Sequence, residues 1–169
     1  RAMMKVENST VSTTGDSSPA IMIADGGGIL IADGGSFTTS GAMSQGIYSK
    51  GDVTVTNASV NALNAKAAVL KGNNTITLSG TTLEGKETAD TIPYNIVLFS
   101  DEKDIGTMGT QHFDVRGGSL ISHKGGMFYV TATHGKISLN GTAITMDNPA
   151  ANLITVAGND GANGWGTPG

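Results

Sequence analysis

The chain has 169 residues, a formal net charge of −4, 14% charged residues and no cysteine. The lack of cysteine excludes disulfides and thiolate metal sites, and the ten scattered Lys and Arg residues argue against nucleic acid as a partner. No apolar run approaches the roughly 18 residues of a membrane-spanning helix, so we expect no membrane insertion.

One phrase recurs from the first residues onward. It reads apolar-x-apolar-polar, then two or three small residues and a further apolar residue, which predicts a short strand, a bend and the start of a second strand. Six copies begin at Met4, Leu30, Val53, Ile76, Phe113 and Ile137, with steps of 26, 23, 23, 37 and 24 residues. Self-similarity at such a period is typical of repeat proteins.

Each copy is followed by a second apolar stretch, within 20–23, 46–48, 68–70, 95–99, 127–130 and 152–156. No helical spacing of apolar residues is sustained, whereas Val, Ile and Thr fill the strands and Gly, Asn and Asp the bends. We therefore predict an all-β solenoid of parallel strands, with about six coils of about 24 residues. An immunoglobulin-like sandwich is the alternative, but it would need antiparallel hairpins and does not explain the regular register.

Stacked coils place equivalent residues in columns, and three apolar columns form the predicted core. They are Met4, Leu30, Val53, Ile76, Phe113 and Ile137; Val6, Ala32, Val55, Leu78, Val115 and Leu139; and Val11, Phe37, Val60, Leu83, Leu120 and Ile144. The bends between the columns carry Gly and Asn, which tolerate positive φ without any ligand.

The step of 37 residues contains additional chain, which we place in two loops of the fourth coil, 84–94 and 100–110. Insertions in solenoids form loops on one face, often the functional one. Both loops are acidic, and the second supplies the candidate binding residues Asp101, Glu102 and Asp104.

The second apolar stretch has two apolar faces. One contains Ile21, Ile47, Val69, Ile96, Phe128 and Leu153, and the other Met22, Tyr48, Leu70, Val97, Tyr129 and Ile154. Only one face can point into the coil, so the other is either covered by an insertion or by continuing chain, or is presented to a partner. In the second case Tyr48 and Tyr129 are the candidate contact residues for carbohydrate or protein.

We predict no catalytic residue, metal site or cofactor. Outward positions of the first strands do not gather carboxylates on neighbouring coils, as acid–base catalysis on a polysaccharide requires. His112, His123 and His134 are eleven residues apart, which puts them at different phases of the coil. We interpret them as exposed loop residues.

The phrases at 73–78, 93–99, 117–120, 127–130 and 156–161 resemble secreted adhesin-like β-helix proteins of bacteria and, more distantly, pectate-lyase-like and autotransporter-passenger solenoids. This resemblance covers nearly the whole chain and implies a right-handed parallel β-helix at the cell surface. It carries over no catalytic residue, and the three-aspartate signature of polygalacturonase-type hydrolases is missing.

We therefore expect residues 1–169 to form one solenoid domain, a fragment of a longer chain against whose continuation it packs. The expected function is an extracellular structural or adhesive module that presents or spaces a surface for a host or cell-surface glycan or protein. A carbohydrate-active or carbohydrate-binding β-helix is the alternative.

Overall fold

The structure is a computed structural model that describes residues 1–101 and 110–167. Its strands form two parallel sheets. The first sheet contains β1 (Met3–Thr13), β3 (Ile29–Thr39), β5 (Asp52–Thr56), β6 (Ser59–Ala62), β8 (Thr75–Ser79), β9 (Thr82–Lys86), β11 (Thr110–Arg116), β12 (Ser119–His123), β14 (His134–Asn140) and β15 (Ala143–Met146). The second contains β2 (Ile21–Ile23), β4 (Ile47–Ser49), β7 (Ala68–Lys71), β10 (Tyr94–Phe99), β13 (Gly126–Thr131) and β16 (Ile154–Ala157), and a short 3₁₀ turn, η1 (Gly161–Asn163), follows.

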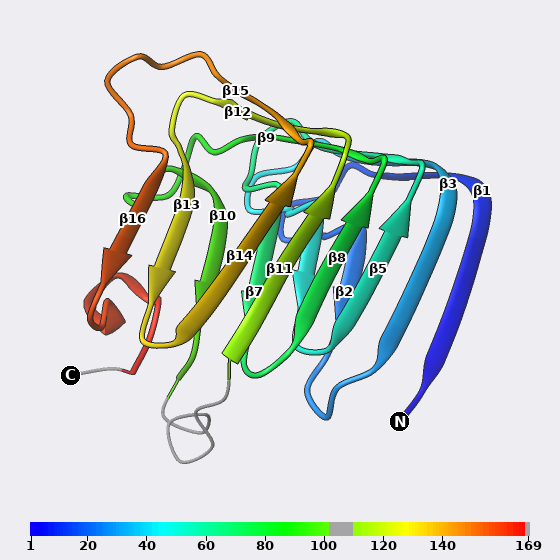
Figure 1. Ribbon diagram of the computed structural model, residues 1–169, viewed down its shortest axis with the longest axis horizontal. Coiled ribbons are helices and arrows are strands. Elements are labelled where there is room, and N and C mark those ends of the chain that lie inside the picture. Colours follow the sequence, from blue (N-terminus) through cyan, green and yellow to red (C-terminus); the bar gives the residue numbers. More distant parts are fainter. Residues whose placement is uncertain (102–109, 168–169) are drawn as a thin grey trace.

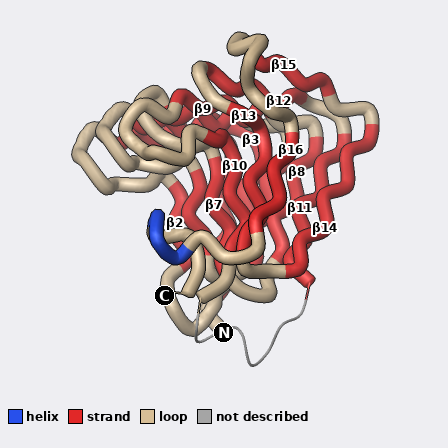
Figure 2. The backbone as a smooth tube through the Cα atoms, turned by 90° about the vertical axis from the view of Figure 1, so that its left-hand side faces the viewer, coloured by secondary structure: helices blue, strands red, loops and turns tan. Residues whose placement is uncertain are grey.

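The chain winds through both sheets about six times and forms a β-solenoid, as the repeat predicts. Figure 1 shows the coils side by side, with the N-terminal and C-terminal coils at opposite ends. Figure 2 views them nearly along the axis, where equivalent strands stack behind one another. Among the described residues, no helix is long and apolar enough to span a membrane.

The first sheet bends where the repeated phrase has its small residues. β1 and β3 run through this bend, whereas later coils break there into β5 and β6, β8 and β9, and β11 and β12. Asn57 and Gly118 occupy the bend with φ of 48° and 63°. A Cβ on Gly118 would lie 2.1 Å from the Thr81 carbonyl oxygen of the preceding coil. The glycine is therefore required both by the backbone conformation and by the close approach of two coils.

The three predicted core columns are present in the predicted register. Leu30, Val53, Ile76 and Phe113 pair in succession through β3, β5, β8 and β11, and the other two columns align in the same way. Members in the middle of the molecule are buried, whereas Met4 and Leu139 in the end coils are 61% and 39% exposed. The ring of Phe113 meets that of Phe128 across the core, with centroids 5.8 Å apart.

In two coils, the second sheet differs from the predicted assignment of inward and outward residues. Ala68, not Val69, pairs with Ile47 and Ile96, and Ile154, not Leu153, pairs with Phe128. Val69 consequently shares the outer column with Tyr48 and Val97. Residues 68–70 and 153–154 are apolar at consecutive positions, so their sequence does not say which residue points inward.

The first insertion is shorter than expected. Residues 84–86 belong to β9 and Tyr94 opens β10, which leaves residues 87–93 as the loop. From the second insertion, Ser100, Asp101 and Thr110 lie in the described part, and Thr110 opens β11. Glu102 and Asp104 lie outside the described residues.

Candidate functional site

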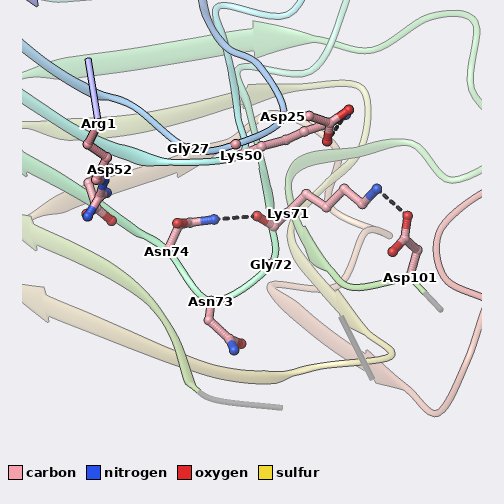
Figure 3. Close-up of a pocket in the computed structure, with 11 residues that line it drawn as sticks. Arg1, Asp25, Gly27, Lys50, Asp52, Lys71, Gly72, Asn73, Asn74 and Asp101 are labelled. Carbon is pink, nitrogen blue, oxygen red and sulfur yellow. Dashed lines mark hydrogen bonds and ion pairs between the residues drawn. The ribbon is translucent and has the colours of Figure 1, made fainter. Parts of the chain in front are cut away.

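A polar groove lies where successive coils leave the second sheet and enter the first (Figure 3). Its volume is about 380 Å³. The lining residues come from the chain start, from the bends after β2, β4, β7 and β10, and from the adjoining ends of β5 and β7: Arg1, Asp25, Gly26, Gly27, Lys50, Asp52, Lys71, Gly72, Asn73, Asn74 and Asp101. We call this set the polar groove.

Ion pairs link different coils at one end of the polar groove. Lys50 Nζ lies 2.9 Å from Asp25 Oδ1, and Arg1 Nη2 donates to Asp52 Oδ2 at 2.5 Å. The second carboxylate oxygen of Asp52 accepts a hydrogen bond from the backbone N–H of Thr75, at 2.9 Å. Asp52 therefore joins three coils at the start of the first-sheet strands.

The other end is formed by the bends after β7 and β10. Lys71 makes an ion pair with Asp101, and its Nζ also lies 5.8 Å from the centre of the Phe99 ring. Asn74 Nδ2 donates to the carbonyl oxygen of Lys71 at 2.8 Å, so the bend is held in shape by its own side chain (Figure 3). The structure thus places the predicted binding residue Asp101 in the polar groove.

The groove offers charged and amide groups at intervals set by the coil spacing, roughly 4.8 Å. Such groups bind hydroxyls and carboxylates by directed, partly charge-assisted hydrogen bonds. The repetition along the axis suits an extended polar ligand better than a compact one.

The predicted tyrosine pair lies elsewhere, on the outer side of the second sheet. Tyr129 is only 6% exposed, and its hydroxyl donates to Asp160 Oδ2 at 2.8 Å. Burial and the adjacent Asp160 carboxylate raise the pKa of Tyr129 to about 12. Tyr48 is half-buried against the same apolar cluster.

Over the later coils this outer face is covered by the chain itself, whereas Met22 in the first coil is 57% exposed. Val69, Val97, Phe99 and Tyr129 form an apolar cluster, here called the outer cluster. Ile92 and Tyr94 of the first insertion and Trp165 near the C-terminus pack against it. Tyr129 is therefore unavailable as a surface contact residue, since its side chain is enclosed.

A second group of polar residues, the His123 cluster, was not anticipated. His123 Nδ1 lies 2.7 Å from Asp147 Oδ2, and Nε2 lies 3.3 Å from Glu84 Oε2. The hydrogen bond with Asp147, supported by Glu84, raises the pKa of His123, and the same bond lowers the pKa of Asp147. Lys86 and Lys124 line the same depression.

The sequence contains a signal for the His123 cluster. Asp147 follows His123 by 24 residues, the step that separates the last two copies of the repeated phrase. The separation of His123 and Asp147 by one coil is missed when the three histidines are compared only with one another. His123 is the last residue of β12 and its side chain is 37% exposed, while His112 and His134 lie in β11 and β14. The prediction that the histidines are exposed loop residues is therefore wrong.

Within the described part of the chain, no group of three or more His, Cys, Asp or Glu side chains has an arrangement that could hold a metal ion. No protein-family model matches the chain, and neither a characterised protein nor a solved structure shows significant similarity to it.

Proposed function

We propose that this β-solenoid is an extracellular structural and adhesive module of the adhesin-like kind, without catalysis, that binds an extended glycan along the polar groove. The observation that carries the proposal is the origin of the groove residues in the bends of successive coils. A ligand with repeating hydroxyl groups would meet a similar set of donors and acceptors on each coil.

Ion pairs between coils hold the bends of the groove in place, which supports a rigid surface that changes little on binding. Charged residues make up only 14% of the chain, and several of them are used in these pairs. A preformed groove loses little conformational entropy when a ligand binds. Because Tyr129 is enclosed, recognition depends on hydrogen bonds and charge more than on aromatic stacking.

A glycan array with the purified chain, followed by calorimetric titration of the best-bound oligosaccharide, tests this proposal. We expect Lys50→Ala and Asn74→Ala each to weaken binding about tenfold, the usual effect of losing one strong hydrogen bond. Lys50→Ala should leave the fold intact, since its partner Asp25 is 79% exposed and remains hydrated.

Lys5→Ala is the matched control. Lys5 pairs with Glu7 at 2.8 Å on the exposed outer side of β1, away from the groove, and its loss should leave affinity unchanged. Absence of binding to any glycan, or equal affinity of the groove variants and the control, would overturn the proposal.

The His123 cluster favours a second candidate, a carbohydrate-active enzyme. A histidine with a raised pKa is a competent general acid near neutral pH, and two carboxylates stand beside it in a depression of about 820 Å³. Release of reducing sugar from a polysaccharide that is lost in His123→Gln but kept in Lys50→Ala would favour this candidate. Equal release by both variants would count against it.

A further inference from the structure

Lys66 is a lysine buried inside the protein, in the bend that precedes β7. Its side chain is 1% exposed and lies beneath the loop 87–93 and Trp165, whose ring centre is 5.5 Å from Nζ. Burial lowers the pKa of Lys66, although the nearby carboxylates of Asp90 and Glu87 oppose this effect. Fully buried lysines are unusual in proteins, because burial removes the water that hydrates the charged amine.

The Lys66 amine is oriented by two backbone carbonyls. Nζ donates to the carbonyl oxygens of Ile92 and Tyr94, the latter at 3.1 Å. Two hydrogen bonds satisfy both N–H groups of a neutral amine and leave its lone pair for a third neighbour. Asp90 Oδ2 at 3.3 Å is the nearer carboxylate and Glu87 Oε2 at 3.7 Å the farther.

The Asp90 carboxyl group is polarised by hydrogen-bond donors on both oxygens. The backbone N–H of Ile92 donates to Oδ1 at 2.9 Å, and Trp165 Nε1 donates to Oδ2 at 3.1 Å. Donors in these positions stabilise the negative oxygen that develops when a nucleophile adds to the carbon.

Glu87 is held so that one oxygen remains directed at the amine. Its Oε1 accepts hydrogen bonds from the backbone N–H groups of Ala89 and Asp90, at 2.9 and 3.2 Å, while Oε2 faces Lys66. Glu87 is only 5% exposed. It can therefore exchange protons with the reacting groups without competition from bulk water.

We propose that Lys66 and Asp90 condense to an intramolecular amide, with Glu87 as the proton carrier. The Nζ lone pair attacks Cγ of the protonated Asp90 carboxyl group, and a C–N bond forms. Glu87 takes a proton from the nitrogen and delivers it to the departing hydroxyl, the C–O bond breaks, and one water molecule leaves. Amine and acid become amide and water, so no oxidant, nucleotide or other co-reactant is needed.

The required neutral pair differs from the ion pair only by one proton moved from Lys66 to Asp90. Burial favours the neutral form of the Lys66 amine, because a charge in a low-dielectric site is poorly solvated. The product would tie the loop 87–93 covalently to the preceding coil.

A second lysine–aspartate pair, Lys50 with Asp25, can be compared with Lys66 and Asp90. Lys50 and Asp25 are closer, at 2.9 Å, but the Asp25 side chain is 79% exposed. Water surrounds the Asp25 carboxylate and competes for the Lys50 amine, so we expect no condensation there. A short distance between an amine and a carboxyl group is therefore not sufficient for condensation, and burial of the pair is also required.

Intact mass spectrometry of the denatured wild-type chain, after folding and incubation at 37 °C, tests the proposal. We expect a mass lower than that of the sequence by one water molecule, and tandem spectra that link the peptide containing Lys66 to the one containing Asp90. Glu87→Gln and Lys66→Arg, each verified as folded by circular dichroism, should show the full mass. The control Lys50→Arg should retain the deficit.

Full mass in the folded wild-type chain would overturn the proposal, as would a deficit that persists in Lys66→Arg or maps to other residues. The wild-type measurement is decisive even where Lys66→Arg fails to fold. Thermal unfolding provides a further readout, since a linked wild type should unfold at a higher temperature than folded Glu87→Gln.

Discussion

The imidazole of His123 contacts carboxylates from both neighbouring coils, Glu84 on β9 and Asp147 after β15. Protonated His123 attracts both, whereas the neutral ring can donate only one hydrogen bond. Its contribution to stability therefore depends on pH.

The raised pKa of His123 predicts the sign of this dependence. Stability from a raised pKa is fully present below the unfolded value, 6.5, and is lost as the pH rises through the folded value. Asp147 acts oppositely at lower pH, since its lowered pKa contributes stability above 3.8 that disappears as the pH falls through the folded value. The cluster should stabilise most between these limits.

Urea unfolding of wild type and His123→Gln checks this prediction. We expect the wild-type midpoint to exceed that of the variant by more at pH 5.5 than at pH 8.5. A gap that is constant or grows with pH would refute the assignment.

At the scale of elements, residues 158–167 fold back over the second sheet as a cover for the outer cluster. The contacts that hold them include Asp160 with Tyr129, Trp165 Nε1 with Asp90, and the Trp165 ring with Phe99, whose centroids are 5.1 Å apart. These contacts link parts of the chain up to 75 residues apart.

Asp160→Ala should loosen this cover without unfolding the coils. The change removes the acceptor for Tyr129 and that for Asn163 Nδ2, at 2.7 Å, which leaves the Tyr129 hydroxyl without its partner. We expect a loss of about 1–3 kcal/mol in unfolding free energy, the usual effect of orphaning a buried hydroxyl.

The fluorescence of Trp165 reports this change directly, because it is the chain's single tryptophan. Its emission should shift to longer wavelength in Asp160→Ala as water reaches the ring, while the far-ultraviolet circular dichroism remains that of a β protein. Asp33→Ala, on an exposed position of β3, is the control and should show neither change. An unshifted spectrum in Asp160→Ala would contradict the covering role.

At the scale of the whole molecule, each coil contacts mainly its neighbours, so stability depends on position along the axis. Leu78 and Leu139 occupy the same core column. Leu78 is fully buried, whereas Leu139 is 39% exposed because it lies in the last coil.

Leu78→Ala and Leu139→Ala therefore form a matched pair. Leu78→Ala should destabilise the protein by about 2–5 kcal/mol, the cost of a buried leucine truncation. Leu139→Ala should cost about 1 kcal/mol or less, since part of its surface is already hydrated. Equal losses in urea unfolding would show that the end coil is packed more tightly than the structure indicates.

The coil architecture could be predicted from the sequence because stacking places equivalent residues in contact. Val53, Ile76 and Phe113 recur at one phase of the repeat, so the first-sheet register follows from counting residues. The same counting fails where apolar residues are consecutive, as at Val69, because no alternation marks the inward side.

The tertiary structure decided what the repeat does not encode. Whether Tyr129 faces solvent depends on residues 158–167, and the surroundings of Lys66 depend on the loop 87–93, neither of which follows the repeat. Asp101 lies in the polar groove because the bends of successive coils converge there. The repeat thus determined the scaffold, because equivalent positions of successive coils contact one another. Segments outside the repeat, brought together by folding, determined that Tyr129 and Lys66 are buried and which side chains surround them.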